Sequence, residues 1–192
     1  MLYWISMTPF AHTAGSYLAA ELAAKLMPYA GINEPTVLLT AVIAGNLPDL
    51  DMFFVKGGSL KHRNTITHTP IFWIIFCSLF IIISTFINHY IFINAFAFTI
   101  GVFTHLFLDW FAARGDGVGG IRLLYPWSKK HYGFHKLKKL PNYVVKNFKF
   151  SKYLFTYYWK DGLLFYSEIL VILAGMGLFI ANVPEYVKYF LK

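Results

Sequence analysis

The chain has 192 residues, of which 57% are hydrophobic, 20% are aromatic and only 14% are charged. Soluble domains carry about a quarter of charged residues, so this composition excludes an ordinary soluble protein and predicts a membrane protein. It also excludes disordered, coiled-coil and disulfide-rich secreted chains, which need low hydrophobicity, charged heptads or many cysteines. The length fits a single membrane-embedded domain over residues 1–192.

The net charge of +8 is concentrated in one segment. Residues 113–161 contain eleven Lys and Arg but only two Asp. A basic segment beside apolar spans is typical of the positive-inside rule and of attraction to anionic head groups, and less often of nucleic-acid binding. We therefore expect a cytoplasmic segment between the fourth and fifth helices that faces anionic membrane lipids, with no nucleic-acid partner.

Five helices are predicted in chain order. Helix-opening prolines predict one helix over 8–27 and another over 33–46, and apolar runs predict spans over 70–88, 91–112 and 163–181. The second helix, at about 1.5 Å per residue, reaches about 20 Å, which is short of a bilayer core of about 30 Å. We expect an all-α, polytopic integral membrane bundle with about three clear spans and an N-terminal helical hairpin, up to five spans in total.

The predicted hairpin returns the chain to the side that it left, whether or not its two helices cross the membrane. The basic segment then marks that side as cytoplasmic. Seven ionisable residues fall on this side: His12, Asp49, Asp51, His62, His68, His105 and Asp109. His89 falls on the opposite side, and we expect no chemical role for it.

His105 and Asp109 lie four residues apart in a predicted span, so both project from one helical face. Ionisable side chains inside an apolar span are costly and mark function by default, although such a pair can also simply lock helix packing. His68 precedes the helix that begins at Thr69-Pro70. The positive end of that helix favours the neutral imidazole that a metal needs, and a capping histidine is the alternative.

Asp49 and Asp51 share a face if their stretch is extended and diverge if it is helical. A solvated turn is the third reading. His and Asp side chains together favour zinc, manganese or ferrous iron, and Cys77 as the single cysteine excludes a structural zinc ribbon. We expect one or two divalent ions at this face, with zinc as the first choice.

Several further residues could complement such a site. Arg63 and Arg122 could hold a phosphate bidentately, or they could be ordinary positive-inside residues. His131 and His135 could be extra ligands or surface residues. Glu168 lies about one turn into the last span, where it could support a ligand.

Five short motifs occur in order along the chain. They are His12, Gly45-Asn-Leu-Pro-Asp-Leu-Asp51, His62-Arg63-x3-Thr67-His68-Thr69, His105-x3-Asp109 and Leu123-Leu-Tyr-Pro-Trp-Ser128. Together they resemble the YdjM-like family of bacterial inner-membrane metal-dependent hydrolases, over roughly residues 8–135. The resemblance implies an integral inner-membrane hydrolase whose His and Asp residues bind metal.

That family is in turn distantly similar to zinc-dependent phospholipases C and single-strand nucleases, which are all-helical enzymes that cleave phosphoesters. Their ligand order matches His12, Asp49, His68, His105 and Asp109. This chain lacks their downstream His-x3-Glu. The resemblance therefore implies one or two ions rather than a three-metal cluster.

The sequence thus predicts a membrane-bound hydrolase that cleaves a phosphoester of a lipid or lipid-linked substrate with a metal-bound hydroxide at the cytoplasmic face. Asp51 would bridge metals or act as general base, and Arg63 and Arg122 would hold the phosphate. The alternative is a non-catalytic, metal-stabilised scaffold or a small transporter; the nearly apolar distal halves of the two clearest spans argue against a transporter. The predicted metal ligands are His12, Asp49, His62, His68, His105 and Asp109.

Overall fold

The computed structural model describes residues 8–28, 31–32, 34–55, 62–112, 120–133 and 162–191, without the side chains of residues 62 and 162–164. Within these ranges the fold is all-helical, as predicted. The α-helices are α1 (Pro9–Leu26), α2 (Pro35–Ala44), α3 (Pro70–Thr85), α4 (His89–Phe111) and α7 (Gly162–Phe190). Three short 3-10 helices lie between α2 and α3, namely η2 (Pro48–Phe53), η4 (His62–Asn64) and η5 (Ile66–His68).

Proline begins three of these helices. Pro9, Pro35 and Pro70 each occupy the first turn, where the fixed φ suits a helix and the missing N–H has no helical partner to lose. Asn88 caps α4 by accepting a hydrogen bond from Ile91 N at 2.8 Å. The predicted starts of the first four helices are therefore confirmed to within about two residues.

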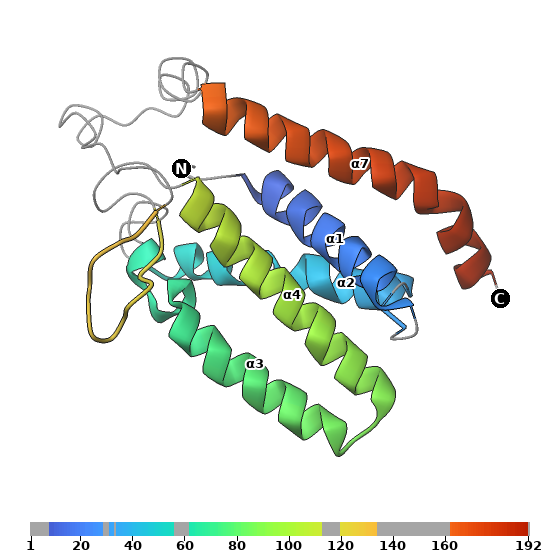
Figure 1. Ribbon diagram of the computed structural model, residues 1–192, viewed down its shortest axis with the longest axis horizontal. Helices are drawn as coiled ribbons and strands as arrows, with labels where there is room; N and C mark the ends of the chain where they lie inside the picture. The colour runs from blue at the N-terminus through green and yellow to red at the C-terminus, as the bar shows by residue number, and fades with distance from the viewer. Residues whose placement is uncertain are drawn as a thin grey trace.

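Helix α4 is the centre of the bundle, with α1, α2 and α3 packed against it, while α7 lies along the outer side of α1 (Figure 1). Small residues permit the closest approaches. A Cβ atom on Gly101 of α4 would lie 2.1 Å from the Ala41 carbonyl oxygen of α2, and one on Gly45 would lie 1.9 Å from Ser16 Oγ. The backbones of α2 and α4 therefore touch one turn before His105.

Among the described helices, α4 and α7 are long and apolar enough to cross a membrane. Helix α3 has 16 residues and reaches about 24 Å, less than a bilayer core of about 30 Å. Helix α3 therefore ends three residues before the predicted end of the span at residue 88. In its last turn the Ser84 and Thr85 hydroxyls donate hydrogen bonds to the Ile81 and Ile82 carbonyls. Helix α7 instead continues past its predicted end at residue 181 to Phe190.

The outer faces of α3 and α7 are apolar and exposed. On α3 the exposed side chains include Ile75, Leu79 and Ile83, and on α7 they include Leu173 and Ile180. Extended exposed apolar surface is unusual in soluble monomers. Surfaces of this kind mark membrane or protein interaction sites.

One end of the bundle collects the polar segments. Helices α1, α3 and α7 begin at this end, α4 ends there, and the 3-10 helices lie beside them (Figure 1). Residues that are far apart in the sequence are thereby brought to one depth.

Candidate metal centre

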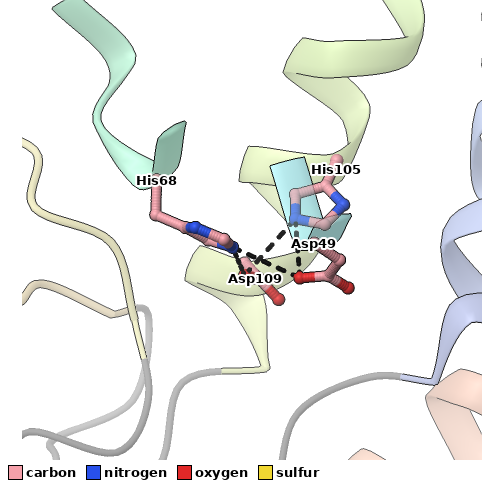
Figure 2. A group of neighbouring side chains, drawn as sticks. All are labelled: Asp49, His68, His105 and Asp109. Carbon is pink, nitrogen blue, oxygen red and sulfur yellow. Dashed lines mark hydrogen bonds and ion pairs between the residues drawn. The ribbon is translucent and has the colours of Figure 1, made fainter. Parts of the chain in front are cut away.

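Four buried side chains meet at this end of the bundle and form what we call the His/Asp cluster (Figure 2). Asp49 comes from η2, His68 from η5, and His105 and Asp109 from adjacent turns of α4. His68 Nε2 lies 3.3 Å from Asp49 Oδ1 and 3.7 Å from Asp109 Oδ2. His105 Nε2 lies 3.6 Å from each of the same two oxygens. Two imidazole nitrogens and two carboxylate oxygens thus face one another.

These four atoms have the spacing of a metal site. Ligands about 2.1 Å from a tetrahedral ion are about 3.4 Å apart, close to the four distances above. His105 Nε2 and Asp109 Oδ2 are buried and have no hydrogen-bond partner in the described part of the chain, and such atoms are costly. Zinc, manganese and ferrous iron all accept a mixed His and Asp donor set. The residues therefore fit a divalent cation.

Both histidines are held with Nε2 toward the centre of the cluster. His105 Nδ1 lies 2.8 Å from the Gly45 carbonyl oxygen, which requires a proton on Nδ1 and leaves the lone pair on Nε2. His68 Nδ1 lies 3.2 Å from Asp51 Oδ2, in the carboxylate–histidine arrangement that orients metal ligands. The contact of α4 with α2 at Gly101 is what brings the Gly45 carbonyl within reach.

Asp49 and Asp51 diverge, as expected of a helical stretch. Helix η2 directs Asp49 to the cluster, while Asp51 Oδ2 accepts hydrogen bonds from Thr65 Oγ1 and Thr67 Oγ1 and contacts the far side of the His68 ring. The extended alternative, in which both aspartates share a face, is therefore wrong. The two threonines were not singled out from the sequence.

The carboxylates around His68 control its charge. Burial alone would lower the pKa of His68, but hydrogen bonds to Asp49 and Asp51 and the charge of Asp109 raise it to about 9. Burial raises the pKa of Asp51, but the hydrogen bond and charge of His68 outweigh burial and lower it. The positive end of α3 predicted a neutral His68 imidazole. In the metal-free protein three carboxylates act on this ring instead and favour its protonated form.

His12 lies directly beside the His/Asp cluster. Its ring stacks on that of His105 with centroids 4.0 Å apart, and its Nε2 lies 3.5 Å from Asp109 Oδ1 and 3.9 Å from Asp49 Oδ2. The side chain is fully buried, and neither ring nitrogen has a hydrogen-bond partner in the described residues. His12 therefore faces the outer oxygens of both cluster carboxylates.

The two arginines lie close by, with different contacts. Arg63 of η4 is buried, and its Nη2 contacts Asp109 Oδ1. Arg122 donates from Nη1 to the Asn64 backbone oxygen at 2.7 Å and from Nη2 to Asn64 Oδ1 at 2.8 Å. Arg63 thus contacts the His/Asp cluster, and Arg122 forms hydrogen bonds with Asn64, the residue after Arg63.

Glu168 supports the start of α1. It accepts a hydrogen bond from Thr8 N at 2.8 Å, just before α1 begins and one turn before His12. The side chains of His62 and His135 lie outside the described residues, as does most of the basic segment over 113–161.

Sequence reasoning missed another buried carboxylate, Glu21, which lies between α1 and α7. Glu21 Oε1 accepts hydrogen bonds from Tyr17 OH at 2.9 Å, Asn182 Nδ2 at 2.7 Å and Tyr186 OH at 2.8 Å. We call these four residues the Glu21 cluster. The signal was present in the spacing, because Tyr17 and Glu21, and Asn182 and Tyr186, are each four residues apart and share a helix face.

Comparison with known proteins identifies a family and a location for the chain. No curated protein and no solved structure matches the chain. The sequence profile of the YdjM inner membrane protein family matches residues 7–184, a range that contains the whole His/Asp cluster and all of α4. The chain therefore belongs to the YdjM inner membrane protein family and is an inner-membrane protein.

Proposed function

We propose that this protein is a metal-dependent hydrolase that cleaves a phosphoester of a lipid or lipid-linked molecule at the cytoplasmic face of the inner membrane. The observation that carries the proposal is the His/Asp cluster, in which four ligand-type atoms from η2, η5 and α4 lie at metal-site spacing. Arg63 contacts Asp109 Oδ1, but Asp109 Oδ2 and His105 Nε2 are buried without a hydrogen-bond partner in the described residues, which is costly. A bound metal is the simplest reason for the arrangement.

Each side chain of the site has a separate task. A divalent cation, when bound by the His/Asp cluster, supplies a Lewis acid that polarises a phosphoryl oxygen and acidifies water. We take zinc as the first choice, with manganese and iron as alternatives. Asp51 Oδ2 already contacts Thr65, Thr67 and His68. We therefore assign Asp51 to positioning His68, in place of the bridging or base role expected from the sequence.

His12 is the candidate for a further metal ligand or for the general base. It is buried 3.5 Å from Asp109 Oδ1 with both ring nitrogens unpartnered in the described residues. A neutral imidazole in that position can act as a further ligand, or it can take a proton from water beside the cluster.

An apolar cavity supports a lipid as the substrate. The cavity has a volume of about 520 Å³ and lies between α1, α2 and α7, from Phe10 and Thr13 near the start of α1 to Phe190 near the end of α7. Its lining is almost wholly apolar, and it begins at the end of the bundle where the His/Asp cluster lies. A hydrocarbon chain would fit there, with one end at Phe10 and Thr13, which lie close to His12 in the sequence.

The test is turnover by purified protein in detergent, loaded with zinc. Phosphatidic acid, phosphatidylglycerol and an isoprenoid diphosphate are supplied separately, and released phosphate or head group is measured. We expect turnover by the wild type and by the matched histidine variant His89→Ala. Asp109→Ala and chelation by EDTA should each lower it by at least about 100-fold. A protein that holds zinc but acts on none of these substrates would contradict the proposal.

The second candidate function is a non-catalytic, metal-stabilised scaffold. It is favoured by the full burial of His68, His105 and Asp109, because structural zinc sites are closed by four protein ligands whereas catalytic sites keep an open position. Cobalt substitution separates the two candidates. A visible spectrum that changes on addition of phosphate indicates an open position, and an unchanged spectrum indicates the scaffold.

A further inference from the structure

Three nitrogen-bearing side chains gather beside the His/Asp cluster without being part of it. Arg63 belongs to η4, while Arg122 and His131 belong to the loop drawn in gold in Figure 1. Within this loop Ile121 and Tyr132 form an antiparallel bridge, with N–O distances of 3.0 and 2.9 Å. The bridge directs the neighbouring residues Arg122 and His131 toward each other, and the charge of Arg122 acts on the His131 ring.

The loop forms hydrogen bonds with η4 next to the buried Arg63. Arg122 donates to both the backbone and the side chain of Asn64. The His131 ring lies against the backbone of Arg63. Burial lowers the pKa of His131, and the nearby charges of Arg122 and Arg63 lower it further. Two guanidinium groups therefore lie close to one neutral imidazole.

These three side chains have buried polar atoms without a hydrogen-bond partner in the described residues. The atoms are Arg63 Nε and Nη1, Arg122 Nε and His131 Nε2. Arg63 is only 3% exposed, and open donors on a buried guanidinium are costly. Its acidic contact is Asp109, through Nη2. In the described part of the chain, no carboxylate lies within ion-pair distance of Arg122.

The balance of charge indicates an anion as the missing partner. Asp49, Asp51 and Asp109 carry three negative charges, of which a divalent cation would balance two. Arg63 and Arg122 then leave one net positive charge beside the cation. A phosphate group offers several acceptor oxygens and matches guanidinium donors in geometry and charge. The neutral His131 can accept the proton of a monoprotonated phosphate.

We propose that Arg63, Arg122 and His131 form a phosphate subsite beside the His/Asp cluster, which takes the phosphoryl group of a phosphate ester. The subsite rests on the proposed function of the adjoining metal centre. Arg63 joins the two parts, because the same guanidinium contacts Asp109 and keeps two nitrogens open.

Binding of inorganic phosphate to detergent-solubilised protein loaded with Mn²⁺ tests the subsite by ³¹P NMR. Manganese in the His/Asp cluster broadens the resonance of phosphate held next to it. We expect Arg122→Ala and His131→Ala each to weaken phosphate binding at least about tenfold, as the loss of a charge-assisted hydrogen bond predicts, with unchanged manganese content. Lys129→Ala removes an exposed charge from the same loop and is the matched control, with unchanged phosphate binding.

Equal phosphate binding by the wild type, Arg122→Ala and His131→Ala overturns the subsite. Thermal unfolding of each variant shows whether the loop substitution has harmed the fold, and Arg122→Lys, which keeps the charge, should restore part of the affinity. Manganese retention without phosphate binding overturns the subsite and leaves the metal centre standing. Arg122-dependent phosphate binding by a protein that takes up no metal supports the subsite and contradicts the proposed function.

A second arm identifies the source of the phosphate. Short-chain phosphatidic acid, below its micellar concentration, is compared with inorganic phosphate in the same titration. Binding at least about tenfold tighter than inorganic phosphate assigns the subsite to a lipid head group, since the chain adds apolar contact. Equal affinity assigns it to free phosphate, and binding of neither ligand overturns it.

Discussion

Glu21 and Asp109 are both carboxylates buried between helices, but their surroundings differ. Glu21 Oε1 receives three hydrogen bonds from neutral hydroxyl and amide donors. Asp109 faces Arg63, His12 and two imidazole nitrogens of the His/Asp cluster, and its Oδ2 has no hydrogen-bond partner in the described residues. The Glu21 cluster satisfies its carboxylate oxygen with donors, whereas in the His/Asp cluster the acceptor atoms His105 Nε2 and Asp109 Oδ2 face each other without a donor in the described residues.

The difference teaches how to separate a helix lock from a metal centre. A buried carboxylate with enough donors needs nothing else, and its network holds two helices together. Here that network joins α1 to α7 through Tyr17, Asn182 and Tyr186. A buried carboxylate that faces unprotonated nitrogen needs a proton or a metal ion. Burial and charge are common to both clusters, so the count of donors is what distinguishes them.

Removing His105 should give the largest effect on this contrast. His105→Ala deletes one of four ligands, and we expect metal affinity to fall by at least about 100-fold, since loss of a supporting contact alone costs about 10- to 100-fold. The measurement is metal content by mass spectrometry after dialysis against a buffered metal solution. His89→Ala at the other end of α4 is the control. Full metal occupancy in His105→Ala would show that the cluster is not the metal centre.

Removing Glu21 should lower the stability of the fold and leave metal binding unchanged. Glu21→Ala leaves the Tyr17, Asn182 and Tyr186 donors without their acceptor, which we expect to cost roughly 2 kcal/mol of stability. Glu21→Gln keeps an acceptor oxygen and should cost less. Thermal unfolding in detergent measures both, and metal content should stay at the wild-type level. A loss of metal in Glu21→Ala with an unchanged melting temperature would reverse the assigned roles.

The pH dependence should belong to the His/Asp cluster alone. Because the pKa of His68 is raised to about 9 in the metal-free protein, metal must displace its proton, and apparent affinity should rise about tenfold per pH unit from pH 6.5 to 8.5. The same shift stabilises the metal-free fold at low pH, and this contribution is lost as pH rises through about 9.

Competition with a chromophoric chelator at three pH values measures the slope. Asp51→Asn removes one cause of the raised pKa, so its affinity should level off at a lower pH than that of the wild type. An affinity independent of pH over this range would contradict a protonated His68.

Much of the bundle could be predicted from local patterns. The starts of α1, α2 and α3 follow from proline at the first turn, and the pairing of His105 with Asp109 follows from helical periodicity. The end of α7 could not be predicted in this way, because polar residues begin at Asn182. The helix continues there since Asn182 and Tyr186 bind Glu21 on α1, which is a tertiary contact.

The candidate site likewise has parts that sequence patterns predict and parts that depend on tertiary contacts. Topology alone brought His12, Asp49, His68, His105 and Asp109 to one end, because helix parity and the positive-inside rule need no side-chain detail. The task of Asp51 depends on the 3-10 conformation of η2. The contact of Arg63 with Asp109 depends on how η4 packs. Neither has a sequence period that would reveal it.

The smallest expected effects come from two variants that each remove a single hydroxyl group. Thr67→Val and Tyr17→Phe each remove one hydroxyl donor from a carboxylate, the partly buried Asp51 in the first case and the buried Glu21 in the second. A net hydrogen bond contributes about 0.5–1.5 kcal/mol. Thr67 acts on the metal only through Asp51 and His68, so we expect Thr67→Val to lower metal affinity about threefold. Tyr17→Phe should leave metal affinity unchanged and slightly lower the melting temperature. Chelator competition and thermal unfolding measure the pair, and equal effects on metal affinity would erase the distinction between the two clusters.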